Sequence, residues 1–149
     1  METLHAKSYG QLTREELYAI LRARQEVFVV EQRCAYRDID GLDENGLHLY
    51  LTDGEGRLAA YLRLLPRADE PGTVHMGRVL TLERGAGLGG RLLKAGIALA
   101  RERMDAREIY IEAQSYAAPF YAREGFQICS EEFLEDGIPH VQMRLKLTD

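Results

Sequence analysis

Four glycines fall within the six residues 85–90, directly after a predicted strand and at the start of the strongest predicted helix. Glycines let backbone N–H groups approach a ligand closely, and a helix N-terminus adds partial positive charge. The segment therefore predicts a cradle for an anionic ligand, preferably a pyrophosphate; the alternative is a loop whose glycines only permit tight packing. The residues expected to contact the phosphates are Arg84, Gly85, Ala86, Gly87, Leu88, Gly89 and Gly90.

The spacing of the glycines limits which phosphate ligand can bind. A P-loop is excluded because no Gly-Lys-Ser/Thr sequence follows the glycines. Gly85, Gly87 and Gly90 do satisfy the G-x-G-x-x-G fingerprint of dinucleotide-binding folds, with Glu112 about 20 residues further on. Only 37 residues follow Glu112, which is too little chain for a doubly wound sheet. An oxidoreductase that uses an NAD(P)-type dinucleotide is kept as an alternative.

Hydrophobic periodicity and turn residues predict the elements that must position this cradle. Apolar residues at helical spacing predict helices over 14–30, 87–104 and 117–124, and a capping box at Thr13 and Glu16 introduces the first of them. Strands are predicted over 4–8, 47–52, 58–65, 74–82, 108–113, 127–133 and 141–147. Since no repeat or linker separates these elements, residues 1–149 are expected to form one mixed α/β domain.

The composition of the 149-residue chain excludes several classes of protein. Hydrophobic residues make up 46% and charged residues 29%, which is typical of a globular domain. The net charge of -5 argues against binding to nucleic acid or to an anionic membrane surface. Cys34 and Cys129 lie far apart, which favours reduced thiols in the cytoplasm, and the four scattered histidines predict no metal site.

Charge is unevenly distributed along the chain. Residues 38–56 hold six carboxylates and residues 124–143 hold five, and neither window contains Lys or Arg. Residues 78–107, which include the glycine segment, hold seven basic and three acidic side chains. We therefore expect a ligand with an anionic part near the cradle and a cationic part near the acidic windows. Within the first window, the run 38–43 predicts an Asx-rich surface turn rather than a calcium loop.

The run Arg84-Gly-Ala-Gly-Leu-Gly89 is followed, one predicted strand later, by Gln114-Ser-Tyr-Ala-Ala-Pro-Phe-Tyr121 and then by Gly125-Phe126. In this order and spacing, the runs resemble the two motifs of the GNAT superfamily of acyl-CoA-dependent N-acyltransferases, Q/R-x-x-G-x-G/A and N-x-x-A-x-x-x-Y. Gln114 replaces the commoner Asn, and the turn before Arg84 is shorter than is usual in the family. The segments 28–32, 38–41, 77–79 and 135–140 resemble its ElaA-like subgroup.

The resemblance implies a fold, a cosubstrate and a set of binding residues. The fold would be a mixed, mostly antiparallel sheet of about seven strands, flanked by helices and splayed at the acyl-CoA site. The cosubstrate would be acetyl-CoA, with no metal ion. A backbone amide of Val79, Leu80 or Thr81 would stabilise the charge on the thioester carbonyl oxygen, and Gln114 and Tyr121 would complete the cofactor site.

The resemblance also implies direct transfer of the acetyl group to an amine. Tyr121 occupies the family's position for the acid that protonates the leaving thiolate; the alternative is a core tyrosine packed against Phe120 and Phe126. For the base, the sequence leaves His140, Glu112 and an ordered water open.

Each of the candidates for the base has a structural alternative. His140 lies at the entry to the last predicted strand, and its alternative role is to pair with Glu135 or Asp136 and fix a loop. Glu112 is alternatively an exposed strand residue without a role. Residues that fall where the family binds its acceptor are Phe28, Glu31, Gln32 and Tyr36.

Together these features predict a cytoplasmic N-acetyltransferase that uses acetyl-CoA and acts on a small-molecule or peptide amine. Neither nucleic acid nor a membrane is an expected partner, and analogy with the family allows a homodimer. The alternative from another class is an acyl-CoA-binding sensor without catalytic activity.

Overall fold

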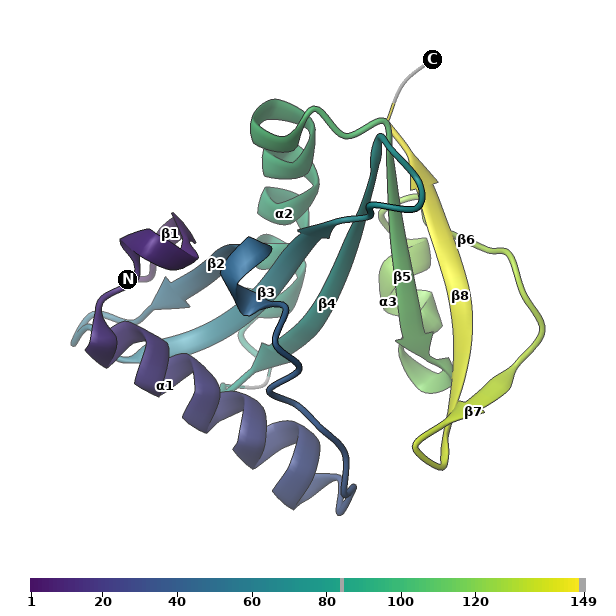
Figure 1. Cartoon of the computed structure of the whole chain (residues 1–149). Helices are drawn as coiled ribbons and strands as arrows, with labels where there is room; N and C mark the ends of the chain where they lie inside the picture. Colours follow the sequence, from purple (N-terminus) through teal and green to yellow (C-terminus); the bar gives the residue numbers. More distant parts are fainter. Residues whose placement is uncertain (84, 148–149) are drawn as a thin grey trace.

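One sheet forms the centre of the structure, a computed structural model that describes residues 1–83 and 85–147 (Figure 1). Its strands run in the order β1-β2-β3-β4-β5-β8-β6, and β7 pairs with β8. Only the β4–β5 pair is parallel within the described residues. The strands are β1 (Thr3–Ser8), β2 (Leu47–Thr52), β3 (Leu58–Pro66), β4 (Thr73–Thr81), β5 (Glu108–Gln114), β6 (Gln127–Ile128), β7 (Phe133–Glu135) and β8 (Ile138–Lys146).

The helices begin and end close to where the sequence predicts. Helix α1 (Arg14–Arg24) continues into a π-helical segment, η2 (Gln25–Glu31), and α2 (Leu88–Met104) and α3 (Ala118–Ala122) follow. The capping box at the start of α1 is confirmed, because the Glu16 N–H donates to Thr13 Oγ1 at 3.0 Å and the Thr13 N–H donates to Glu16 Oε1 at 2.8 Å. In the described part of the chain, no helix is long and apolar enough to cross a membrane.

Short 3-10 turns complete the connections at η1 (Tyr9–Gln11), η3 (Asp43–Asn45) and η4 (Ser115–Ala117).

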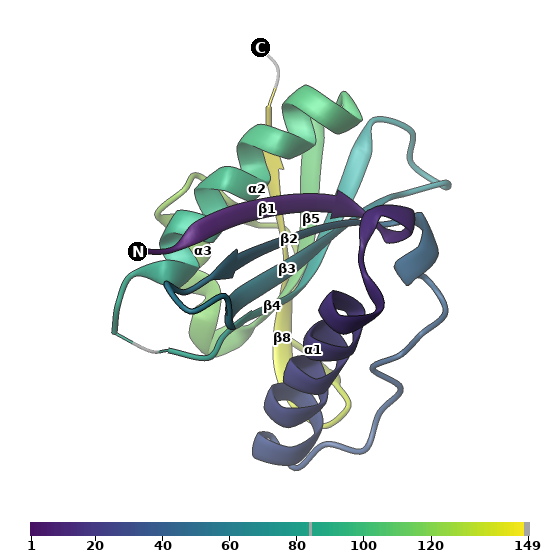
Figure 2. The same ribbon diagram turned by 90° about the vertical axis from the view of Figure 1, so that its left-hand side faces the viewer.

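Alternating side chains of the strands supply a hydrophobic core on each face of the sheet. Leu49 and Leu51 belong to the larger cluster, under α2 and α3, whereas Tyr50 between them belongs to a smaller cluster under α1. Leu92 and Leu93 of α2 are fully buried in the larger cluster. Helices α1 and α2 therefore cover opposite faces of the sheet (Figure 2).

Strands β4 and β5 separate after a short stretch of pairing, and this opens the sheet (Figure 1). Thr73, Val74 and His75 pair with Glu108, Ile109 and Tyr110, and no pairing follows. The splayed, mostly antiparallel sheet predicted from the family resemblance is thus confirmed. A sheet with one parallel pair among the described strands is not doubly wound, so the dinucleotide-binding alternative is wrong.

The strand predicted over 127–133 is divided, so the sheet has eight strands rather than about seven. Ile128 pairs with Met143, but Phe133 pairs with His140, so two extra residues lie between β6 and β7. There the Gln142 N–H donates to Ser130 Oγ at 2.9 Å instead of to a strand carbonyl. The chain then turns back into β8 through two residues with positive φ, Asp136 at 51° and Gly137 at 79°.

Candidate functional site

A pocket of about 460 Å³ lies where β4 and β5 separate. Its walls come from β4, β5, the end of η2, and the hairpin of β7 and β8. Most of the residues that the sequence singled out line it: Val79, Leu80, Thr81, Glu112, Gln114, Tyr121, His140, Phe28, Glu31, Gln32 and Tyr36. The described residues of the cradle, 85–90, do not line this pocket; they come after β4 in the chain, and the last residue of β4, Thr81, does line it. Arg84 lies outside the described residues.

Three of the four glycines of the cradle, Gly85, Gly87 and Gly90, are not explained by packing. Gly85 has φ +83° and Gly87 has φ +72°, values that L side chains rarely adopt, and Gly87 caps the N-terminus of α2. A Cβ atom added to Gly85, Gly87 or Gly90 would meet no atom of the described residues within 4 Å. Open space at these positions, next to the free amides of a 17-residue helix, fits an anionic ligand that approaches the backbone.

Two other cradle residues have packing roles. Leu88 is buried in the core under α2, so only its backbone is available to a ligand. A Cβ at Gly89 would lie 3.5 Å from the side chains of Phe120 and Thr81, which is ordinary van der Waals contact.

Strand β4 contains a bulge where it lines the pocket. Tyr61 pairs with Leu80 but Arg63 pairs with Gly77, so two residues of β4, Arg78 and Val79, oppose one residue of β3. Arg78 has the positive φ of 55°. Because this part of β4 has no partner strand on its β5 side, backbone groups at that edge are available to a ligand in the pocket.

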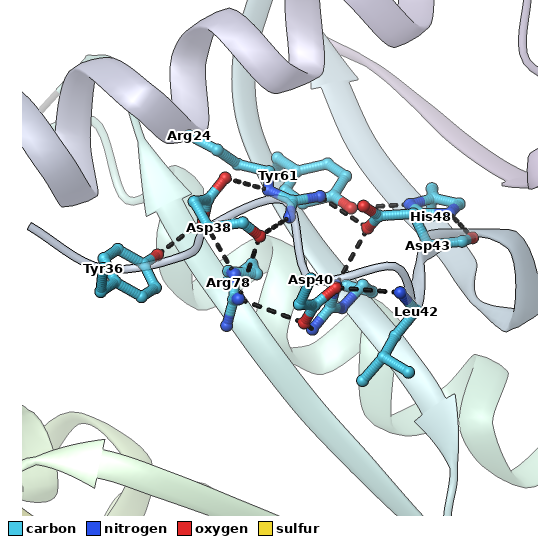
Figure 3. A network of polar contacts seen from close by, with 10 residues as sticks. Arg24, Tyr36, Asp38, Asp40, Leu42, Asp43, His48, Tyr61 and Arg78 are labelled. Atoms are coloured by element: carbon cyan, nitrogen blue, oxygen red, sulfur yellow. Dashed lines mark hydrogen bonds and ion pairs between the residues drawn. The ribbon is translucent and has the colours of Figure 1, made fainter. Parts of the chain in front are cut away.

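The Arg78 side chain belongs to a network of ion pairs with the segment that follows η2 (Figure 3). Its Nε lies 2.9 Å from Asp38 Oδ1, and its Nη2 lies 3.2 Å from Asp40 Oδ2. Arg24 of α1, which is 0% exposed, contacts Asp38 Oδ2 at 2.9 Å and Asp43 Oδ1 at 2.7 Å. The network therefore ties α1 to the bulged strand.

The Asx turn expected over 38–43 is confirmed, because the Leu42 N–H donates to Asp40 Oδ1 at 3.0 Å, but the run does not lie wholly at the surface. Asp38 and Asp43 are buried, and Arg63 contacts both Asp40 and Asp43. Although burial by itself would raise the pKa of Asp40, the hydrogen bond and charge of Arg63 lower it to about 2. The three carboxylates of this run are neutralised inside the protein and are not free to bind a cationic ligand. Glycine and aspartate in the run indicated a turn, but the sequence held no signal that distant arginines would pair with it.

Tyr121 combines burial with an open hydroxyl. Its ring packs edge-on against Phe120 and Phe126, with centroid separations of 5.0 and 5.8 Å. Among the described residues the hydroxyl has no hydrogen-bond partner, and burial raises the pKa of Tyr121 above its usual value. The hydroxyl therefore stays protonated at neutral pH, at the wall of the pocket.

His140 and two glutamates form the other wall. His140 Nδ1 lies 2.7 Å from the carbonyl oxygen of Ile138, which identifies it as the protonated nitrogen and leaves Nε2 as an acceptor. Nε2 lies 3.6 Å from Glu135 Oε2. Glu112 accepts a hydrogen bond of 2.7 Å from Tyr110 and lies within hydrogen-bond reach of Glu135.

The two glutamates titrate in opposite directions. Burial would raise the pKa of Glu112, but hydrogen bonds from Tyr110 and Glu135 lower it below its usual value. Burial, the hydrogen bond to Glu112 and the nearby negative charges raise the pKa of Glu135 to about 7. The sequence named Glu135 only as a possible partner of His140, a pairing that the 3.6 Å contact supports, and not as a site residue. The signal that could have found it is the Asp136-Gly137 dipeptide, which is typical of a two-residue hairpin and predicts strands on both sides.

Gln114 has a protein partner at the pocket. Its Nε2 donates to Gln32 Oε1 at 3.2 Å and so joins β5 to the residue after η2. The amide that the family resemblance assigns to the cofactor thus also links the two sides of the pocket.

Comparison with known proteins gives consistent results over nearly the whole chain. A family model described as an acetyltransferase (GNAT) domain matches residues 10–147. A UPF0039 protein of Schizosaccharomyces pombe is 41% identical over 144 residues, which are 95% of each chain. The crystal structure of Escherichia coli ElaA superposes with a TM-score of 0.90 at 33% identity, covering 97% of this chain and 99% of that one. An acyl-CoA N-acyltransferase from Pseudomonas aeruginosa gives a TM-score of 0.87 at 42% identity, with the same coverage.

Proposed function

This chain belongs to the GNAT acetyltransferase family, and we propose that it transfers an acetyl group from acetyl-CoA directly to a primary amine of a small-molecule or peptide acceptor. The family supports acyl transfer from CoA; the acetyl group and the cationic amine are our proposal. The observation that carries it is the separation of β4 from β5, because the opened strand β4 both lines the pocket and leads into the glycine cradle.

In this proposal the cofactor binds along β4. The pyrophosphate contacts the amides of the cradle and the N-terminus of α2. The space beside Gly90, which the described residues leave open, accommodates it. The thioester then lies beside residues 79–81. A backbone amide there donates to the carbonyl oxygen as it gains negative charge, which lowers the barrier because the donor is already in place.

Tyr121 serves as the acid in the proposed reaction. Its raised pKa keeps the proton on the hydroxyl until a thiolate forms, and its hydroxyl has no competing partner among the described residues. For the base, His140 presents Nε2, which lies 3.6 Å from Glu135 Oε2, and Glu112 has a carboxylate at the same wall.

The charge of the pocket supports a cationic acceptor. Glu112, Glu135 and Asp136 line it, whereas the guanidinium of Arg78 is already paired with Asp38 and Asp40. The window 124–143 thus supplies acidic groups to the pocket, while the carboxylates of the run 38–43 are neutralised. An alkylammonium fits this wall better than an α-amino acid, whose carboxylate would face these glutamates.

The test is release of free thiol from acetyl-CoA with a panel of polyamines, aminoglycosides, peptides and amino acids, each amino acid beside its decarboxylated amine. We expect turnover with amines that lack a neighbouring carboxylate and little with the matched amino acids. Propionyl-CoA as donor tests the preference for acetyl. Stabilisation by CoA without thiol release from any amine would contradict the proposal and favour a sensor of acyl-CoA.

A further inference from the structure

Glu112 and Glu135 face each other in the pocket from strands on opposite edges of β8. The hairpin turn at Asp136 and Gly137 fixes the direction of Glu135, and a hydrogen bond of 2.7 Å from Tyr110 fixes Glu112. Both side chains lie in the wall that also contains His140. Neither carboxyl group has a contact with Lys or Arg in the described structure that would neutralise it.

Every charged group facing this pair bears on its proton affinity. Glu112 faces Tyr110, Glu135, His75 and His140. Glu135 faces Glu112, Asp136, His140, whose Nε2 lies 3.6 Å from Glu135 Oε2, and, at longer range, Arg78. The carboxylates outweigh the single cation, which is itself paired with Asp38 and Asp40. Two carboxyl groups this close share one proton more readily than they both ionise.

We propose that Glu135 is the general base of the transfer reaction and that Glu112, which faces it across the pocket wall, is a positioning residue that holds it. The proposal rests on the acyl transfer proposed above and adds the group that activates the acceptor. A base with a pKa of about 7 is well matched to neutral pH, whereas an alkylamine with a pKa near 10 arrives protonated.

The acceptor enters as an ammonium, and ionised Glu135 takes one of its protons, leaving a neutral amine. The amine nitrogen forms a bond to the thioester carbon, the carbon–sulfur bond breaks, and the sulfur leaves with the electron pair and receives the proton of Tyr121. The second proton lost by the nitrogen restores Tyr121, and Glu135 releases its proton to solvent.

Glu135→Gln tests the base, since glutamine keeps the size and the hydrogen bond to Glu112 but cannot take a proton. With an amine that is active in the panel, we expect kcat at pH 7 to fall by about 100-fold or more. In the wild type, kcat/KM falls as pH drops through about 7, because protonated Glu135 is inactive. In Glu135→Gln this fall near pH 7 is absent. The residual rate instead rises at high pH, as the fraction of unprotonated amine increases.

Glu112→Gln tests the positioning role. Loss of the neighbouring negative charge lowers the pKa of Glu135, so the pH at which kcat/KM falls moves to a lower value. A purely structural change would instead lower the rate at every pH. Glu131→Gln, at an exposed position in the connection between β6 and β7, is the matched control and leaves the rate and profile unchanged.

A ¹³C titration of the glutamate side chains in the free protein needs no acceptor. One carboxyl group with a midpoint near 7, absent in Glu135→Gln, supports the proposal; titration of every glutamate below about pH 5 overturns it. It is also overturned if Glu135→Gln keeps the wild-type kcat and the fall of kcat/KM near pH 7. That result would assign the pH dependence to another group, such as His140. Absence of thiol release by the wild type is a different result, since it contradicts the proposed function itself.

Discussion

Tyr121 has a packing role, which its ring performs, and a proposed chemical role, which its hydroxyl performs. Removing the hydroxyl alone therefore tests the chemical role. In Tyr121→Phe the ring contacts with Phe120 and Phe126 remain, but the proton for the leaving thiolate is lost. We expect kcat to fall by about 100-fold or more, with the affinity for CoA and the melting temperature nearly unchanged. Steady-state kinetics and a thermal melt measure both.

Tyr18→Phe on the exposed side of α1 is the matched control and leaves the rate unchanged. If Tyr121→Phe keeps the wild-type kcat, Tyr121 is a core residue only, and water or another group protonates the thiolate.

At the scale of elements, the start of α2 combines helix stability with ligand binding. Gly90 lies in the first turn, and within the part of the chain that the structure describes a Cβ there would meet no atom closer than 4 Å. Gly90→Ala is therefore expected to stabilise the free protein by up to about 1 kcal/mol. The same methyl group would project toward the phosphates, so CoA should bind about tenfold more weakly, measured by the shift in melting temperature with CoA.

Gly96→Ala in the same helix is the contrasting variant. Its Cβ would lie 3.0 Å from Met76 Cε and 3.1 Å from Leu62 Cδ2, so it should destabilise the fold by about 1–3 kcal/mol and leave the CoA affinity alone. If Gly90→Ala binds CoA as the wild type does, the pyrophosphate does not lie on this turn.

Helices and strands with long periodic patterns could be predicted from the sequence. Very short strands, and contacts between residues far apart in the chain, could not. Helix α2 and strands β2 to β5 follow directly from apolar spacing. Strand β7 has three residues, too few for a periodic signal, and its position depends on a turn. The place of the glycine segment at the start of α2 was predictable because its spacing is local, whereas the pairing of Glu112 with Glu135 depends on how β5, β7 and β8 come together.

At the scale of the whole molecule, buried ion pairs connect α1, β3 and β4. Asp43 contacts both Arg24 and Arg63, so Asp43→Asn leaves two buried guanidinium groups short of a carboxylate. We expect a loss of about 3–5 kcal/mol in the free energy of unfolding at pH 7, measured with urea. Asp69→Asn, which removes an exposed partner of Arg67, should cost less than about 1 kcal/mol.

The same pairs set the response to acid. The pKa values of Asp40 and Asp43 lie below their unfolded values, so their contribution is complete above about pH 5 and is lost as pH falls toward 2. Wild-type stability should therefore fall between pH 5 and 2, and more steeply than that of Asp43→Asn. Equal slopes would contradict this assignment.

The central claim, direct transfer from CoA to an amine, is tested by one single-turnover measurement. Excess protein is mixed with acetyl-labelled acetyl-CoA and an amine active in the panel, quenched at short times, and analysed by mass spectrometry of both protein and small molecules. We predict that label appears on the amine as free CoA appears, with none on the protein, including Cys34, which lines the pocket. Labelled protein that forms and decays before the product, or CoA release without a labelled amine, would contradict direct transfer.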